Sequence, residues 1–225
     1  MSDIANNIES IKKLIPASVK LVAVSKTRPA EDILSAYNAG QRYFGENRVQ
    51  ELLAKKDKLP GDIEWHLIGH LQSNKVKLIV PFIGMIESVD SFRLLSVIDS
   101  EASGIGRIVD CLLQIHIAKE ETKFGFNMQE INEMILSDDF GRLKSVRICG
   151  LMGMATFTDN TEVIRDEFNY LSECYKDLKT NKYSNIPSFK EISMGMSGDY
   201  QIAVQQGSTI IRIGSLIFGD RKLKQ

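Results

Sequence analysis

A lysine directly follows a run of small and branched apolar residues near the start of the chain. The stretch LVAVSK ends at Lys26, and the residues before it are typical of a buried strand. A lysine amine withdrawn from water loses preference for its charged form, and a neutral amine attacks aldehydes and other carbonyls. On this stretch alone, the favoured alternative is that the strand ends at Ser25 and Lys26 extends into solvent.

Two later loops contain residues that suit an anion. Ser197 and Gly198 occur in MSGDY, and Gly214 and Ser215 occur in RIGSL. Small residues let backbone N–H groups and hydroxyls approach a phosphate closely. Each loop alone would be ordinary turn chemistry, so the assignment depends on whether the fold brings the two loops together.

Arg212 and Asn47 each allow two interpretations. Arg212 is a permanent cation that could face a bound ligand, or it could pair with a carboxylate such as Glu191 or Asp220. Asn47 could contact a bound ligand, or it could cap a helix together with Glu46.

Composition narrows the class of protein. The chain has 225 residues, a formal net charge of -1 and no Lys/Arg-rich block, which argues against a nucleic-acid surface or a polybasic membrane patch. Its three cysteines are widely spaced and indicate neither disulfides nor a metal site. Without an export signal or an apolar run of transmembrane length, we expect a cytoplasmic protein that binds a small molecule.

Short apolar runs alternate with helical patterns along the chain. Apolar residues at helical spacing predict helices within 30–40, 47–61, 91–104 and 161–179. Eight candidate strands lie at 20–26, 42–46, 64–69, 85–90, 107–118 in part, 147–154, 191–196 and 209–214.

This alternation predicts an α/β fold in which a parallel sheet closes into a single (β/α)8 TIM barrel. An open doubly wound sheet is the alternative, but its glycine-rich fingerprint is missing after the first strand. We expect one domain over residues 1–225, with 119–126 as a candidate lid and 181–188 as a second loop.

The barrel changes the interpretation of Lys26. Active sites of such barrels lie at the carboxyl ends of the strands, and phosphate binds at the loops after strands seven and eight. Lys26, as the last residue of the first strand, would share the inward side with Val22 and Val24. An imine-forming lysine opposite a phosphate site describes a site for pyridoxal 5'-phosphate.

Six stretches carry a resemblance that spans nearly the whole chain: AVSKT, FGENRVQE, WHLIGHLQSNK, GLMGMAT, SMGMSGDY and IRIGSLIFG. Together they resemble the pyridoxal phosphate homeostasis proteins, whose barrel is similar to the N-terminal domain of alanine racemase. The resemblance implies a Schiff base on Lys26, phosphate contacts from Ser197, Gly214 and Ser215, and Arg212 opposite the pyridine nitrogen. Where many family members have threonine, this chain has Ser215, which keeps the hydroxyl.

Two classes of function then compete. A carrier would hold and deliver the cofactor without substantial turnover, with transient contacts to apoenzymes that depend on it, and we expect such a carrier to be a monomer. An amino-acid racemase-like enzyme would need proton donors on both faces of the substrate, and the sequence leaves no residues for the second domain that supplies one in alanine racemases. The carrier is favoured. A cofactor-free Schiff-base aldolase is a third alternative.

Overall fold

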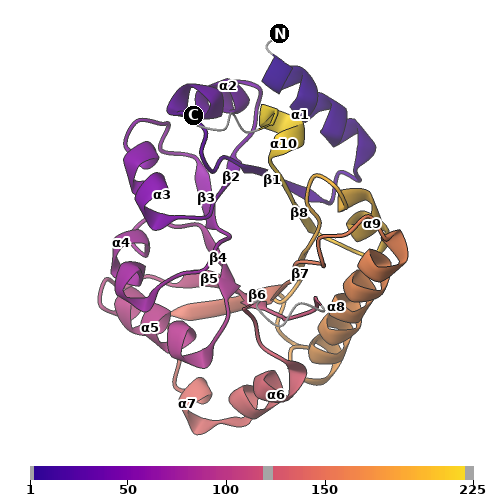
Figure 1. Cartoon of the computed structure of the whole chain (residues 1–225). Coiled ribbons are helices and arrows are strands. Elements are labelled where there is room, and N and C mark those ends of the chain that lie inside the picture. Colours follow the sequence, from indigo (N-terminus) through magenta and orange to yellow (C-terminus); the bar gives the residue numbers. More distant parts are fainter. Residues whose placement is uncertain (1–2, 119–123, 221–225) are drawn as a thin grey trace.

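The computed structural model describes residues 3–118 and 124–220, in which eight parallel strands close into a barrel in chain order (Figure 1). β1 pairs with both β2 and β8, which closes the ring. This confirms the predicted TIM barrel. The strands are β1 (Lys20–Val24), β2 (Tyr43–Glu46), β3 (Glu64–Leu67), β4 (Met85–Val89), β5 (Val109–Gln114), β6 (Val146–Met152), β7 (Glu191–Ser193) and β8 (Ile210–Ile213).

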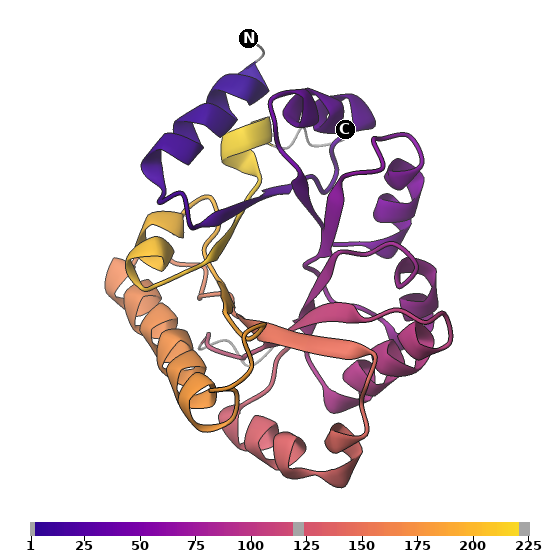
Figure 2. The ribbon, with the colours of Figure 1, turned by 180° about the vertical axis from the view of Figure 1, so that it is seen from behind.

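Helices surround the strands on the outside of the ring, as views from both ends show (Figures 1 and 2). Short α10 lies beside α1, and the Asn7 side chain donates a hydrogen bond to the Ile217 carbonyl at 3.0 Å. The helical segments are α1 (Asp3–Leu14), α2 (Ala30–Asn38), α3 (Val49–Lys56), η1 (Ser73–Lys75), α4 (Val76–Ile79), α5 (Phe92–Ser103), α6 (Met128–Leu136), α7 (Asp138–Gly141), α8 (Thr161–Asn181), α9 (Tyr200–Gln205) and α10 (Ser215–Phe218).

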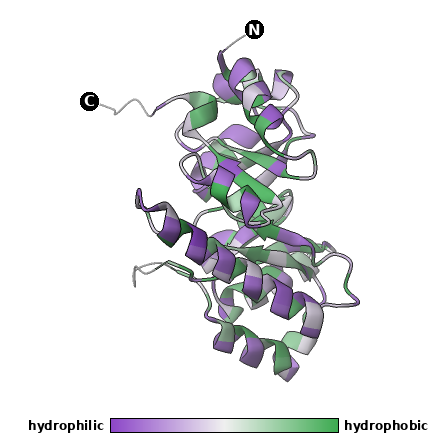
Figure 3. Cartoon of the chain, turned by 90° about the vertical axis from the view of Figure 1, so that its right-hand side faces the viewer, coloured by the Kyte–Doolittle hydropathy of each residue, from purple (hydrophilic) through white to green (hydrophobic). Residues whose placement is uncertain are grey.

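The apolar core has two layers because successive strand residues point to opposite faces. A small cluster inside the barrel includes Val22, Met85 and Leu112, while a larger cluster between strands and helices includes Leu21 and Ala23. The helices carry both hydrophilic and hydrophobic segments (Figure 3), as expected for elements that cover a sheet on one side and face water on the other.

The first strand ends earlier than predicted. β1 ends at Val24, so the prediction that Lys26 is its last residue was wrong. The Ser25 amide still donates to the Gly45 carbonyl at 3.0 Å, but the Ser25 carbonyl accepts from the Arg28 amide at 3.0 Å and closes a turn. Thr27 then adopts a φ of 65°, which takes the chain out of the extended conformation.

Other parts of the chain differ from the predicted elements or lie outside the described residues. Helix α1 was not predicted, although its isoleucines at 4, 8 and 11 have helical spacing and Ile8 and Ile11 are buried. Helices α6 and α7 were also not predicted. The predicted loop 181–188 begins as α8 ends at Asn181. Of the candidate lid, residues 119–123 lie outside the described part of the chain.

Candidate functional site at the carboxyl ends of the strands

All six residues singled out from the sequence line one cavity of about 440 Å³: Lys26, Asn47, Ser197, Arg212, Gly214 and Ser215. They come from the ends of β1, β2, β7 and β8, or from the loops that follow, and the carboxyl ends of parallel strands meet at one mouth of a barrel. The fold therefore gathers positions that are up to 189 residues apart in sequence.

Lys26 faces the cavity even though the strand has ended. Val22 belongs to the cluster inside the barrel, and Val24 and Lys26 both line the cavity. Ser25, between them, is fully buried on the other side, where its hydroxyl donates to Glu46 Oε1 at 2.6 Å. The alternation expected for a strand thus continues through Lys26 and presents its side chain to the mouth.

Arg212 is held by a buried polar chain inside the barrel. Its guanidinium donates to the Ser193 hydroxyl at 2.6 Å and to the Gly153 carbonyl at 2.9 Å. Ser193 in turn donates to Glu87 at 2.5 Å, and Arg212 Nη1 lies 3.8 Å from the same carboxylate oxygen. The carboxylate that faces Arg212 is therefore Glu87, whereas the sequence suggested Glu191 or Asp220.

Glu87 is also bound from the opposite side. His66 Nδ1 lies 2.5 Å from Glu87 Oε1, and both side chains are buried. Burial, the largest influence, would raise the pKa of Glu87, but the hydrogen bonds and the charges of His66 and Arg212 outweigh it, and the pKa lies below its usual value. Burial lowers the pKa of Arg212, and the charge of Glu87 opposes that change.

The two predicted phosphate loops touch each other. The Gly214 amide donates to the Ser197 hydroxyl at 3.3 Å, which leaves the Ser197 O–H able to donate to a ligand. A Cβ at Gly214 would lie 3.3 Å from the Val24 carbonyl oxygen, so the backbone passes closely over the end of β1. Asp199 stays inside its own loop, where it accepts from the Met196 amide at 2.5 Å.

Asn47 presents a buried polar atom to the same cavity. Its Oδ1 has no hydrogen-bond partner among the described residues. The capping interpretation fails, because the N-cap of α3 is Arg48 and no side-chain cap is made there. The backbone of Gly69 packs directly against the backbone of Asn47, since a Cβ at Gly69 would lie 2.5 Å from the Asn47 carbonyl oxygen. Asn47 Oδ1 is therefore a polar atom that a molecule bound in the cavity could contact.

Sequence reasoning missed Glu87 and Ser193 as the groups that orient Arg212. The signal was present in MIESVD, where a glutamate interrupts an apolar strand at a position that shares a face with Met85. His66 is likewise a buried residue with a polar partner, since its Nδ1 contacts Glu87. The loop 156–159, which also lines the cavity, was not singled out.

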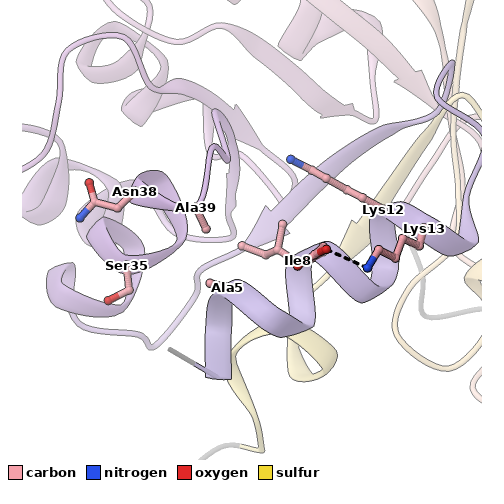
Figure 4. A pocket seen from close by; sticks show the side chains of 8 residues that line it. Ala5, Ile8, Lys12, Lys13, Ser35, Asn38 and Ala39 are labelled. Carbon is pink, nitrogen blue, oxygen red and sulfur yellow. Dashed lines mark ion pairs between the residues drawn. The ribbon is translucent and has the colours of Figure 1, made fainter. Parts of the chain in front are cut away.

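A second cavity, of about 660 Å³, lies outside the barrel between α1 and α2 (Figure 4). It is lined by Ile8, Lys12 and Lys13 on one side and by Ser35 and Asn38 on the other, and Lys13 pairs with Glu9. Its two lysines lie on an exposed helix face and converge on no buried polar group. Across residues 3–118 and 124–220, no cluster of His, Cys, Asp and Glu could hold a metal ion.

Comparison with known proteins agrees with this geometry. The family model for the alanine racemase N-terminal domain matches residues 1–222. A pyridoxal phosphate homeostasis protein of Aquifex aeolicus is 39% identical over 90% of this chain and 87% of that protein. This chain belongs to the pyridoxal phosphate homeostasis protein family.

Solved structures extend the comparison. PipY of Synechococcus elongatus, solved with PLP bound, is 38% identical with a TM-score of 0.86, over 96% of this chain and 100% of that one. An alanine racemase of Clostridium difficile is 15% identical with a TM-score of 0.74, over 98% of this chain and 60% of the racemase. The racemase shares the barrel fold.

Proposed function

We propose that this protein binds pyridoxal 5'-phosphate and serves intracellular homeostasis of that cofactor as a carrier, without substantial turnover. The observation that carries the proposal is the convergence of Lys26, the Ser197–Gly214 contact and Arg212 on one cavity. A lysine amine, phosphate donors and a ring-facing cation are the three groups that the aldehyde, the phosphate and the pyridine ring require.

The residues present fit the cofactor. Lys26 supplies the amine that bonds the aldehyde carbon, and Ser197, Gly214 and Ser215 supply hydroxyl and backbone donors for the phosphate. Asn47 supplies a side-chain amide whose buried Oδ1 has no partner among the described residues, which suits the polar ring substituent. When bound, the cofactor supplies an electron-withdrawing ring, and the permanent cation Arg212 keeps its nitrogen unprotonated and weakens that withdrawal.

The proposal extends to the domain organisation, oligomeric state, partners and location of the carrier. Residues 1–225 form one cofactor-binding domain that works as a monomer and meets PLP-dependent apoenzymes transiently. A cytoplasmic location suits three buried cysteines that form no disulfide. Within the described ranges, no helix has both the length and the apolar character needed to cross a bilayer.

Transfer of the cofactor tests the carrier role. The protein is loaded with pyridoxal 5'-phosphate, freed of excess by gel filtration, and mixed with an unrelated PLP-dependent apoenzyme whose activity is then followed. We expect a visible absorption band on the loaded protein and activation of the apoenzyme. Lys26→Ala, prepared in parallel, is expected to deliver no cofactor. A parent protein that retains none after gel filtration would contradict the proposal.

A further inference from the structure

The two peptide groups on either side of Lys26 are both bound by one turn of helix α3. Before Lys26, the Ser25 carbonyl accepts from Lys55 Nζ at 2.9 Å. After it, the Thr27 amide donates to Glu51 Oε2 at 2.7 Å. Glu51 and Lys55, here called the α3 pair, are four residues apart and therefore lie on the same helix face, where they also contact each other at 3.4 Å.

Thr27 needs such a contact because its backbone is strained. Its φ of 65° makes it the one positive-φ residue other than glycine in the described ranges. A β-branched residue in the left-handed region is unfavourable and persists only where its surroundings hold it. The Thr27 amide, whose direction depends on that φ, is held by Glu51.

Every donor of the Lys55 ammonium group has a partner, and one of these partners is the peptide carbonyl that precedes Lys26. Its three partners are the Ser25 carbonyl, Glu46 at 2.7 Å and Glu51 at 3.4 Å, which match the three donors of an ammonium group. The Lys55 and Glu46 side chains are 11% and 0% exposed. A buried ion pair adds little net stability compared with apolar packing, and its better-attested contribution is a defined geometry.

We propose that Glu51 and Lys55 are positioning residues for Lys26, which fix the peptide groups on both sides of it and thereby hold its amine toward the cavity for attack on an aldehyde. Neither member of the α3 pair lines the cavity, so each acts through Lys26. This inference rests on the proposed function. In the step concerned, the amine nitrogen bonds the aldehyde carbon, and the aldehyde oxygen leaves as water with the two protons of the neutral amine.

Two measurements on the full chain test the proposal. The first is hydrogen exchange of the Thr27 amide in the protein without cofactor. The second is the rate at which added pyridoxal 5'-phosphate forms its visible band and can be trapped on Lys26 by borohydride. The variants are Glu51→Ala, Glu51→Gln and Lys55→Met. Lys56→Met is the matched control, because Lys56 pairs with Asp57 instead. Ile98→Val, a buried change in α5, controls for lost stability.

We expect Glu51→Ala and Lys55→Met to slow trapping about tenfold or more, since small misplacements of a reacting group have effects of that order. Glu51→Ala should also speed Thr27 exchange about tenfold. Glu51→Gln keeps an acceptor for the Thr27 amide. Its trapping rate and its Thr27 exchange rate should therefore both lie close to those of the parent protein. Lys56→Met and Ile98→Val should match the parent protein.

Two results would overturn the positioning role. One is Thr27 exchange that Glu51→Ala leaves unchanged. The other is trapping in Glu51→Ala and Lys55→Met that is as fast as in Ile98→Val. A parent protein that forms no bond at Lys26 contradicts the proposed function instead, and the exchange measurement still decides whether the α3 pair holds the loop, because it needs no cofactor.

Discussion

At the scale of single residues, the site combines groups with separate tasks. Lys26 presents an amine, and Ser197 presents a hydroxyl whose oxygen is already occupied by the Gly214 amide. Arg212 is oriented by Ser193 and the Gly153 carbonyl, so the cation cannot swing away from the barrel mouth without leaving buried partners unsatisfied. Single substitutions in the site are therefore expected to weaken contacts with different parts of the cofactor.

Ser197→Ala is expected to weaken retention of pyridoxal 5'-phosphate by about tenfold, the usual range for one hydrogen bond to a charged group. Pyridoxal, which lacks the phosphate, should bind the variant and the parent protein equally. Equilibrium titration of the visible band measures both affinities. Ser35→Ala, at the second cavity, is the control and should change neither. If the variant lost affinity for the two aldehydes alike, Ser197 would not bind the phosphate.

The contributions of two buried glutamates to the free energy of unfolding are expected to change with pH in opposite directions. The folded protein depresses the pKa of Glu87 below 4.5, because contacts with His66, Arg212 and Ser193 outweigh its burial. Burial raises the pKa of Glu46 above 4.5, against the hydrogen bonds from Lys55 and Ser25 and the charge of Lys55, which lower it. The stability from Glu87 is therefore present above pH 4.5 and is lost as the pH falls through its folded pKa.

The stability from Glu46 is present below pH 4.5 and is lost as the pH rises through its folded pKa. Urea unfolding of the parent protein, Glu87→Gln and Glu46→Gln between about pH 3 and pH 8 measures these differences. The advantage of the parent over Glu87→Gln should shrink toward acid pH. Relative to Glu46→Gln, the parent should lose stability toward neutral pH. If the stability difference between parent and variant changed with pH in the same way for Glu87→Gln and Glu46→Gln, the opposite pKa shifts of the two glutamates would be contradicted.

At the scale of elements, the site forms where strands end. The barrel, its strand order and the mouth that carries the site could be predicted, because strand and helix patterns alternate and parallel strands require that arrangement. The end of β1 could not be predicted, since it is set by a turn at the Ser25 carbonyl and by the positive φ of Thr27, which the pattern of apolar residues does not report. The contact of Arg212 with Glu87 joins residues 125 positions apart, which no local pattern reports.

Gly150 in β6 offers a test of the close packing between strands β6 and β7. Its φ is +152°, and a Cβ there would lie 1.8 Å from the Glu191 carbonyl oxygen of β7. Gly150→Ala must separate two paired strands, so we expect a loss of about 3 kcal/mol in the free energy of unfolding. Gly141→Ala, where no atom lies within 4 Å of the new Cβ, should cost far less. Similar losses for both variants in urea unfolding would contradict the close packing.

At the scale of the whole molecule, the proposed cofactor site is a cavity at one mouth of the closed barrel. Fixed polar partners hold Arg212, and the cavity opens at the mouth beside the loop 156–159, where Phe157 is 95% exposed. A site of this kind can bind and release an aldehyde cofactor, while a racemase needs water exclusion and proton donors on both faces of its substrate.

The carrier role predicts little chemistry on amino acids. Deuterium incorporation at the alpha carbon of alanine and serine, measured in heavy water with loaded protein, should not exceed that of Lys26→Ala with the same cofactor concentration. The reason is that Arg212, in the contact with the ring nitrogen that we propose, would weaken the ring as an acceptor of electrons. Incorporation on the order of 1 per second or faster, absent in the variant, is a typical enzymatic rate and would favour the racemase-like alternative.

The central claim is that Lys26 holds pyridoxal 5'-phosphate at the mouth of this barrel. Its most direct test is to load the protein, reduce it with borohydride and locate the modified peptide by mass spectrometry. We predict a phosphopyridoxyl adduct on Lys26 in nearly all of the protein, with none at that position in Lys26→Ala. An adduct found instead on another lysine such as Lys75, or spread over surface lysines with Lys26 unmodified, would contradict the account.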